Sequence, residues 1–495
     1  MKFNQIMNEK DDKPAGFYLK PDSIQKEVTF VTEDGWTISG SLTIPSKQPK
    51  SERRPAVLLL HSSMHSRSVW VSFPGWAKLQ ESVVTLRIDI RGRGKSEGGT
   101  PFIEMPQAER DKVVLDVRAA LDFIGTQDEV DHRRIGVVAE EFSAGPAVIG
   151  AMQDSRVGVL VLLSGILSQS AMEVLAGNRN KPMLFIVSKE DKRGFADMTK
   201  AYSLNKNPQS DIWVQDGLGV GVTMCNMWRN RYADRPIENA LDFAAGAWLE
   251  EQLRLLGNVR EITIETEDGW ILYANLGLPE AIDRGQTVPG VILLPTALTD
   301  RNIYRNLERL LLANNIAFLN LEYRGIGKSI NKGSYIDQSL AEIMAGRRDL
   351  HRGYQVLTSC NGVDADRIGV LGALLAANYA LNGAKENPNL RAIGMLDPVV
   401  WAWSDAGDRD TLSSIKQPVL VVTGDGMGEL TRNFASTVAE NYSNKVLTYP
   451  GSIVAYLRFR EDRELEPTIV SWFKKQLEVH RSELKEVGVS GATCP

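Results

Sequence analysis

Thr32-Glu-Asp-Gly-Trp36 and Thr266-Glu-Asp-Gly-Trp270 are the same five residues, and the likeness continues far along the chain after each copy. The first copy is followed by Pro55-Ala-Val-Leu-Leu-Leu60 and Arg91-Gly-Arg-Gly-Lys-Ser96; the second is followed by Pro289-Gly-Val-Ile-Leu-Leu294 and Arg324-Gly-Ile-Gly-Lys-Ser329. Matching residues lie 233 or 234 positions apart throughout. A repeat of this length is a duplicated domain, not a solenoid unit. Each half therefore serves as a template for the other.

Composition predicts a soluble globular protein of at least two domains. The chain has 495 residues, 43% of them hydrophobic and 24% charged, with a formal net charge of −5. This mild acidity gives no reason to expect nucleic acid or an anionic membrane as a partner. No apolar run approaches the roughly 18–20 residues of a membrane span, and the first ten residues lack a signal-peptide core. Three cysteines are too few for a disulfide framework or a zinc site. We expect a cytoplasmic protein with no cofactor and no metal.

Short apolar runs predict the strands of a parallel sheet that is buried on both faces. They are separated by helical stretches and occur in the same order in each half, at 56–60, 82–90, 135–138, 157–163 and 183–187, and again at 291–294, 316–321, 368–371, 392–396 and 419–422. An alternating hairpin precedes each set. We predict an N-terminal arm (1–25), two α/β domains (26–256 and 257–484) and a flexible tail (485–495).

Each half resembles the α/β-hydrolase fold, most closely its dienelactone-hydrolase and prolyl-oligopeptidase-like branch. The resemblance is carried by the Thr-Glu-Asp-Gly-Trp hairpin, by the Asp89–Ser96 loop that follows a strand, and by an Arg-Ile-Gly-Val strand (134–137 and 367–370) that enters a sharp turn. It covers nearly the whole chain, twice. It implies two tandem domains, each a mostly parallel sheet flanked by helices, without a large cap. Activity is a separate question, because one fold hosts many functions.

The Gly-Lys-Ser sequences at 94–96 and 327–329 could be phosphate-binding loops. A Walker loop requires a glycine five residues before the glycine of Gly-Lys-Ser, and these positions hold Asp89 and Glu322. We therefore interpret both as tight glycine turns.

The resemblance implies a nucleophile on a strained strand-to-helix turn, Gly-x-Ser-x-Gly, followed by an acid and a histidine after later strands. Aligned without gaps, the turn Ala139-Glu-Glu-Phe-Ser143 places Glu141 at the nucleophile position, and the second half places Leu374 there. Leucine has no nucleophilic atom. Glutamate is a carboxylate, but its longer side chain and the missing first glycine argue against a nucleophilic role.

The histidine and acid positions are also altered. The loops after the last strands place Val220 and Val454 where the resemblance implies histidine. The acid position keeps Asp191 in the first half and holds Met427 in the second. An aspartate at a strand end is more often a turn or helix-cap residue than a catalytic one. The usual general base is thus missing from both halves.

One rearrangement would restore chemistry to the first domain. A two-residue slip would bring Ser143 to the turn, and His61 and His65 follow the first central strand at the same mouth. The second half argues against this slip, because its turn aligns with that of the first half without gaps. His61 matches a strand-end histidine that is usually structural in the resembled family.

Two hypotheses remain open. In the first, the chain is a non-catalytic binding or scaffold protein whose partner is another protein subunit or a small apolar or acyl ligand. In the second, it is a hydrolase of ester or related acyl substrates with an unorthodox site in the first domain only, drawn from Ser143, Glu141, His65, His61 and Asp191. Both predict that the second domain is inactive.

Overall fold

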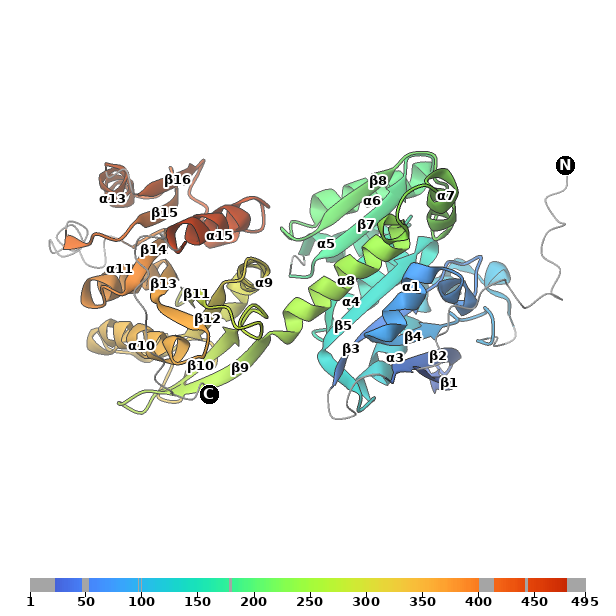
Figure 1. The fold of residues 1–495 in the computed structure, drawn as a ribbon, viewed down its shortest axis with the longest axis horizontal. Coiled ribbons are helices and arrows are strands. Elements are labelled where there is room, and N and C mark those ends of the chain that lie inside the picture. The colour runs from blue at the N-terminus through green and yellow to red at the C-terminus, as the bar shows by residue number, and fades with distance from the viewer. Residues whose placement is uncertain are drawn as a thin grey trace. The chain divides into compact units, whose positions relative to one another are not determined.

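The computed structural model describes residues 23–46, 53–96, 98, 100–177, 180–399, 414–440 and 444–478. The predicted tail (485–495) and all but the last three residues of the predicted arm (1–25) lie outside these ranges. The chain divides into two compact units, Met1–Gly257 and Asn258–Pro495, each of which contains one sheet with its own helices (Figure 1).

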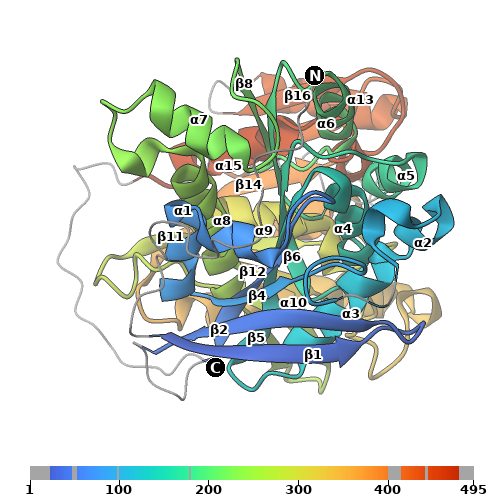
Figure 2. The ribbon, with the colours of Figure 1, turned by 90° about the vertical axis from the view of Figure 1, so that its right-hand side faces the viewer.

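The first unit contains an eight-stranded sheet in the order β1-β2-β4-β3-β5-β6-β7-β8. The hairpin of β1 and β2 lies at one edge of this sheet and pairs antiparallel with β4 (Figure 2). All other pairs are parallel. The strands are β1 (Ser23–Val31), β2 (Thr37–Pro45), β3 (Arg54–Leu60), β4 (Val84–Ile88), β5 (Val130–Glu140), β6 (Val157–Leu163), β7 (Met183–Ser188) and β8 (Asp211–Gln215).

The second unit repeats this sheet in the same sequential order, β9-β10-β12-β11-β13-β14-β15-β16. Its register matches as well: Ser41 opposes Arg87 in the first unit, and their counterparts Asn275 and Asn320 oppose each other in the second. The strands are β9 (Val259–Glu265), β10 (Ile271–Gly277), β11 (Val288–Leu294), β12 (Ala317–Glu322), β13 (Val363–Ala373), β14 (Leu390–Leu396), β15 (Val419–Gly424) and β16 (Lys445–Tyr449).

Helices cover both faces of each sheet, which explains why the central strands are almost uniformly apolar. In the first unit one face packs against α3 (Val113–Gly125), α4 (Ala144–Ala151), α5 (Gln169–Gly177) and α6 (Lys192–Leu204). The other face packs against α1 (Pro74–Lys78), α7 (Thr223–Arg231) and α8 (Leu241–Gly257). The short α2 is Gln107–Asp111.

In the second unit, α10 (Leu340–Thr358), α11 (Leu375–Glu386) and α13 (Glu429–Ala439) share one core with the sheet. On the other face, Phe473 of α15 (Leu465–Gln476) packs against β13 and β14, and α9 (Arg305–Ala313) packs against α15 and β12. The short α14 is Ala455–Arg458. None of the helices in the described part of the chain is long and apolar enough to cross a membrane.

A buried ion network explains why the Thr-Glu-Asp-Gly-Trp hairpin and the Arg-Gly-x-Gly-Lys-Ser loop recur together. Arg91 donates from Nη1 to Asp34 (2.9 Å) and from Nε to Asp116 of α3 (2.8 Å), and it lies 5.4 Å from the ring of Trp36. The second unit repeats all three contacts with Arg324. Each hairpin is thus tied to the loop after the neighbouring strand.

The first Gly-Lys-Ser turn packs closely on a carboxylate of its own domain. Gly94 has a φ of +50°, and a Cβ there would lie 2.3 Å from the carboxyl carbon of Asp89. Asp89 accepts the backbone N–H of Lys95 (3.0 Å), whose Nζ lies 3.3 Å from Glu27. The lysine is therefore committed to a carboxylate inside its own domain, and the turn closes on Asp89 instead of cradling a phosphate.

Candidate functional site

The loops after the parallel strands gather at one edge of each sheet, because the carboxyl ends of parallel strands point the same way. In the first unit this edge brings together the loop after β3, the turn after β5 and the loop after β8. Every candidate residue of the first domain lies in or beside these segments or at the end of β7.

The turn after β5 is strained at the position that the ungapped alignment assigns to the nucleophile. Glu141 has a φ of +46°. Its counterpart Leu374 has a φ of +52° and a ψ of −119° and precedes α11 directly. Such backbone costs a non-glycine residue on the order of 1–3 kcal/mol. The structure therefore places Glu141 and Leu374 at the tip of the same sharp strand-to-helix turn.

Ser143 does not reach that tip. It lies two residues further on, in the short 3-10 turn Glu141–Ser143, and it is fully buried. Its hydroxyl donates to the backbone oxygen of His61 at 2.5 Å. The hypothesised slip and the rearranged Ser143–His65 pair are thus not present, because the hydroxyl already holds the end of β3 against α4.

Glu140 organises the site, and sequence reasoning did not single it out. This carboxylate is completely buried. Its Oε1 accepts from the backbone N–H of Ser62 (2.9 Å) and from Nδ1 of His65 (2.9 Å), and its Oε2 accepts from the N–H of Val222 (3.0 Å). A single side chain therefore joins the three loops. The available signal was an acidic residue directly after the apolar run 135–139.

His65 and Glu141 both have shifted pKa values. The hydrogen bond to Glu140 raises the pKa of His65 above its usual value, against the opposing effect of partial burial. Burial raises the pKa of Glu141, and the negative charge of Glu140 raises it further. Within the described part of the chain the carboxylate of Glu141 forms no hydrogen bond. An imidazole held by Glu140 and a carboxylate without a hydrogen bond thus lie close enough at this mouth to influence each other's pKa.

His61 has a structural role. It is completely buried, its Nδ1 lies 2.7 Å from the oxygen of Ser62, and its Nε2 accepts the N–H of Ile90 at 3.2 Å. Burial lowers the pKa of His61. A neutral ring that bonds backbone on both sides joins the ends of β3 and β4 and has no nitrogen left for substrate.

Asp191 caps a helix. It is the N-cap residue of α6, and its carboxylate accepts the N–H of Gly194 at 2.9 Å. Its charge contributes to raising the pKa of Glu141, so it lies near the mouth. Ser164 also holds the last loop, since its hydroxyl accepts the N–H of Gly221 at 2.8 Å.

Val220 and Val454 stand where the resemblance implies histidine, and Met427 stands where it implies an acid. The structure places them in the segments that follow β8, β16 and β15. Val220 is partly exposed in the loop after β8, between two glycines of positive φ. Val454 is the N-cap residue of α14, and the backbone oxygen of Met427 accepts from Arg432. Within the described residues, no group of three or more His, Cys, Asp or Glu side chains is placed to hold a metal ion.

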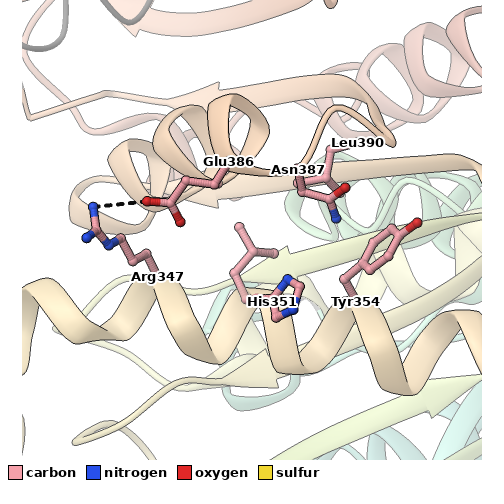
Figure 3. Close-up of a pocket in the computed structure, with 8 residues that line it drawn as sticks. Arg347, His351, Tyr354, Glu386, Asn387 and Leu390 are labelled. Atoms are coloured by element: carbon pink, nitrogen blue, oxygen red, sulfur yellow. Dashed lines mark ion pairs between the residues drawn. The ribbon is translucent and has the colours of Figure 1, made fainter.

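A shallow pocket lies elsewhere, between α10 and α11 of the second unit (Figure 3). It is lined by Arg347, Leu350, His351, Tyr354, Gly383, Glu386, Asn387 and Leu390. Arg347 and Glu386 form an ion pair across it at 3.1 Å. It lies at the end of α11 opposite Leu374, so it is not part of the edge that carries the candidate residues.

No family model matches the chain. The uncharacterized protein YcjY of Escherichia coli strain K12 is 25% identical to it over 145 residues, which are 29% of this chain and 46% of that protein. The chain thus spans less than half the length of this curated relative.

Similar solved structures are hydrolases. The Pyrococcus furiosus esterase Pf2001 is 18% identical and matches 44% of this chain and 93% of its own, with a TM-score of 0.36. A dienelactone hydrolase from Anabaena variabilis is 17% identical over 46% and 98%, with a TM-score of 0.36. The 2,6-dihydroxy-pseudo-oxynicotine hydrolase is 15% identical over 62% and 88%, with a TM-score of 0.37. By its own sheet order, with the crossed third and fourth strands and the sharp turn after the fifth, each half of the chain has the α/β-hydrolase fold.

Proposed function

We propose that the chain is a binding or scaffold protein that keeps two α/β-hydrolase frames without the Ser-His-Asp reaction. The observation that carries this proposal is the pair of residues at the tips of the two strained turns. Glu141 and Leu374 occupy the position where acyl transfer needs a hydroxyl nucleophile. The serine that follows Glu141 in the turn, Ser143, is buried and bonded to backbone.

The hydrogen-bond donors of the first site support the same proposal. Acyl transfer needs backbone N–H groups that are aimed at the developing oxyanion. The N–H of Ser62, at the end of β3, donates instead to the buried carboxylate of Glu140. A substrate oxygen would have to compete with a carboxylate for this donor.

The second site favours an apolar occupant, either a small ligand or a partner surface. Leu374 lies at the turn, Leu298 follows β11 with 77% of its surface exposed, and Ile453 follows β16 and is partly exposed. The loops at this edge thus carry apolar side chains where the first unit carries Glu141 and His65, which favours an apolar occupant over a charged one.

A serine-directed fluorophosphonate and a panel of short aryl esters test this proposal. We expect no stoichiometric labelling of the full chain and no turnover above buffer. Stoichiometric labelling that Ser143→Ala abolishes would overturn the proposal, since it would show that the hydroxyl of Ser143 is reactive.

A second candidate function is a hydrolase of ester or related acyl substrates, confined to the first domain. It is favoured by the hydrogen bond between the buried Glu140 and His65, because a buried carboxylate that holds an imidazole is the arrangement of an acid–base catalyst. His65 would donate a proton to the leaving group, and Glu141 would accept one from water.

Turnover measurements on short esters separate the two candidates. If the hydrolase is correct, His65→Ala and Glu141→Gln each lower kcat/KM at least tenfold. Thr299→Ala, at the position of the second domain that matches His65, is the control and leaves kcat/KM unchanged. Equal turnover in all variants would exclude this candidate.

A further inference from the structure

A buried arginine on β4 has one edge of its guanidinium without an acceptor. Only 3% of the surface of Arg87 is exposed, and its Nε and Nη2 have no hydrogen-bond partner among the described residues. Burial lowers the pKa of Arg87 to about 10. Nε and Nη2 are the two donors of the edge that binds a carboxylate side-on. In this same chain, Arg324 binds Asp349 through that edge, with distances of 3.0 Å from Nε and 2.7 Å from Nη2.

Further buried polar groups surround this edge and also lack partners. Thr85 lies two residues before Arg87 on the same face of β4, and Thr43 of β2 lies directly opposite Thr85. Both hydroxyls are buried without a hydrogen bond. The short turn Leu79–Glu81 packs on these two strands and brings Gln80, whose amide nitrogen is likewise buried without an acceptor. Such a concentration of unpaired donors is uncommon in a folded protein.

The charges around Arg87 do not balance. The positive groups are Arg87, Arg67 and Lys95; the negative groups are Glu27 and Asp89. Both carboxylates are already bonded to Arg67, and Glu27 also pairs with Lys95. One positive charge is therefore not compensated. It belongs to Arg87, which is buried and forms no ion pair with the described residues.

The second unit shows what completes this arrangement. Asn320 and Asn275 stand at the positions of Arg87 and Ser41, and their side-chain amides donate to one oxygen of Glu308 at 2.7 and 2.9 Å. Glu308 is a completely buried carboxylate on α9. The offset of 233 or 234 puts Gly75 or Pro74 at this position in the first unit. The polar face of β2 and β4 is thus kept in both units, but only the second unit carries a carboxylate at this helix position. Gly75 instead packs against Asp242 of α8, whose carboxylate accepts the N–H of Gly75 at 2.6 Å.

We propose that the first unit binds a small carboxylate on the β2–β4 face, held side-on by Nε and Nη2 of Arg87 and by the hydroxyls of Thr43 and Thr85. The bound group accepts from Arg87 as Glu308 accepts from Asn320 in the second unit. It neutralises the surplus charge and satisfies the donors of Arg87, which otherwise remain desolvated at a cost. The site lies on the sheet face beneath Gln80, not at the edge that carries Glu141, so it does not depend on the function proposed above.

Thermal unfolding of the full chain in sodium formate and in sodium chloride, at equal ionic strength, tests the proposal. We expect formate to raise Tm by about 3–6 °C at ten times its Kd, with a shift that grows with the logarithm of the formate concentration above Kd, and chloride to have a smaller effect. Arg87→Met removes the formate effect and raises Tm in its absence, since methionine is apolar and needs no counter-ion. Arg193→Met, which changes an exposed arginine of the same unit, keeps the wild-type response.

A crystal structure of the wild-type chain grown in formate gives an answer that does not depend on the folding of a variant. Two oxygens of formate within hydrogen-bond distance of Nε and Nη2 of Arg87 would support the proposal. Water alone at these two atoms would overturn it. So would equal Tm shifts in formate and chloride, or a formate shift that persists in Arg87→Met.

Discussion

Replacing Glu140 with glutamine tests whether the hydrogen bonds of Glu140 hold the three loops together, independently of the carboxyl group of Glu141. The Glu140 carboxylate accepts three hydrogen bonds on two oxygens. A glutamine amide has one oxygen, so its NH2 group must face either Val222 N–H or the donors of Ser62 and His65. The better orientation still leaves the buried N–H of Val222 without an acceptor and loses a bond to a charged group. These losses predict a decrease of about 2–4 kcal/mol in the free energy of unfolding.

Glu141→Gln is the matched control, one residue away on the same turn. The Glu141 carboxylate forms no hydrogen bond, and its pKa is raised by burial and by Glu140. Removing its charge therefore costs nothing in contacts, and the free energy of unfolding changes by less than about 0.5 kcal/mol. Urea denaturation measures both variants. Hydrogen exchange analysed by mass spectrometry then shows whether the loss is confined to residues 53–177 of the first unit.

The pKa of His65, measured by NMR titration, supplies a second readout. In the wild type, the hydrogen bond to Glu140 raises the pKa of His65. In Glu140→Gln that partner is neutral, and we expect the pKa of His65, followed by NMR titration, to fall back toward its ordinary value. The reasoning is refuted if the two variants lose equal stability, or if the pKa of His65 is the same in the wild type and in Glu140→Gln.

Three further predictions concern the two frames. Because its folded-state pKa is raised, charged His65 stabilises the first unit below pH about 6.5; this contribution is lost as pH rises through the raised pKa, and His65→Gln flattens that part of the stability–pH curve. Arg91→Met and Arg324→Met each leave a buried carboxylate unpaired and cost about 3–5 kcal/mol by urea denaturation; a loss below 1 kcal/mol in either would contradict the role of the network. Gly94→Ala, which drives a Cβ into the Asp89 carboxyl, lowers Tm more than Gly35→Ala, which has positive φ but open space; equal shifts would show that backbone strain alone decides.

The sequence predicts the frame well because the duplication tests every element twice. The apolar runs, the hairpins and the ungapped register of the sharp turn all follow from local patterns that recur at a constant offset. That register explains why Glu141 and Leu374 reach the same strained conformation.

The site was less predictable because its bonds join distant segments. Glu140 meets Ser62 and Val222 across 78 and 82 residues, and no spacing rule links a carboxylate to backbone N–H groups so far away. Ser143 matched part of a motif, yet its hydroxyl bonds to the backbone of His61. Arg87 could not be singled out at all, since the missing acceptor becomes visible only when the two sheets are compared.

Leu374 shows that a strained turn of this kind can carry a side chain without a reactive atom. Its left-handed backbone is held by the path from β13 into α11. A survey that ranks candidate enzymes by unusual backbone angles would score this turn as highly as one that carries a hydroxyl. For proteins of this architecture, the informative quantity is the difference between the side chains carried by equivalent turns.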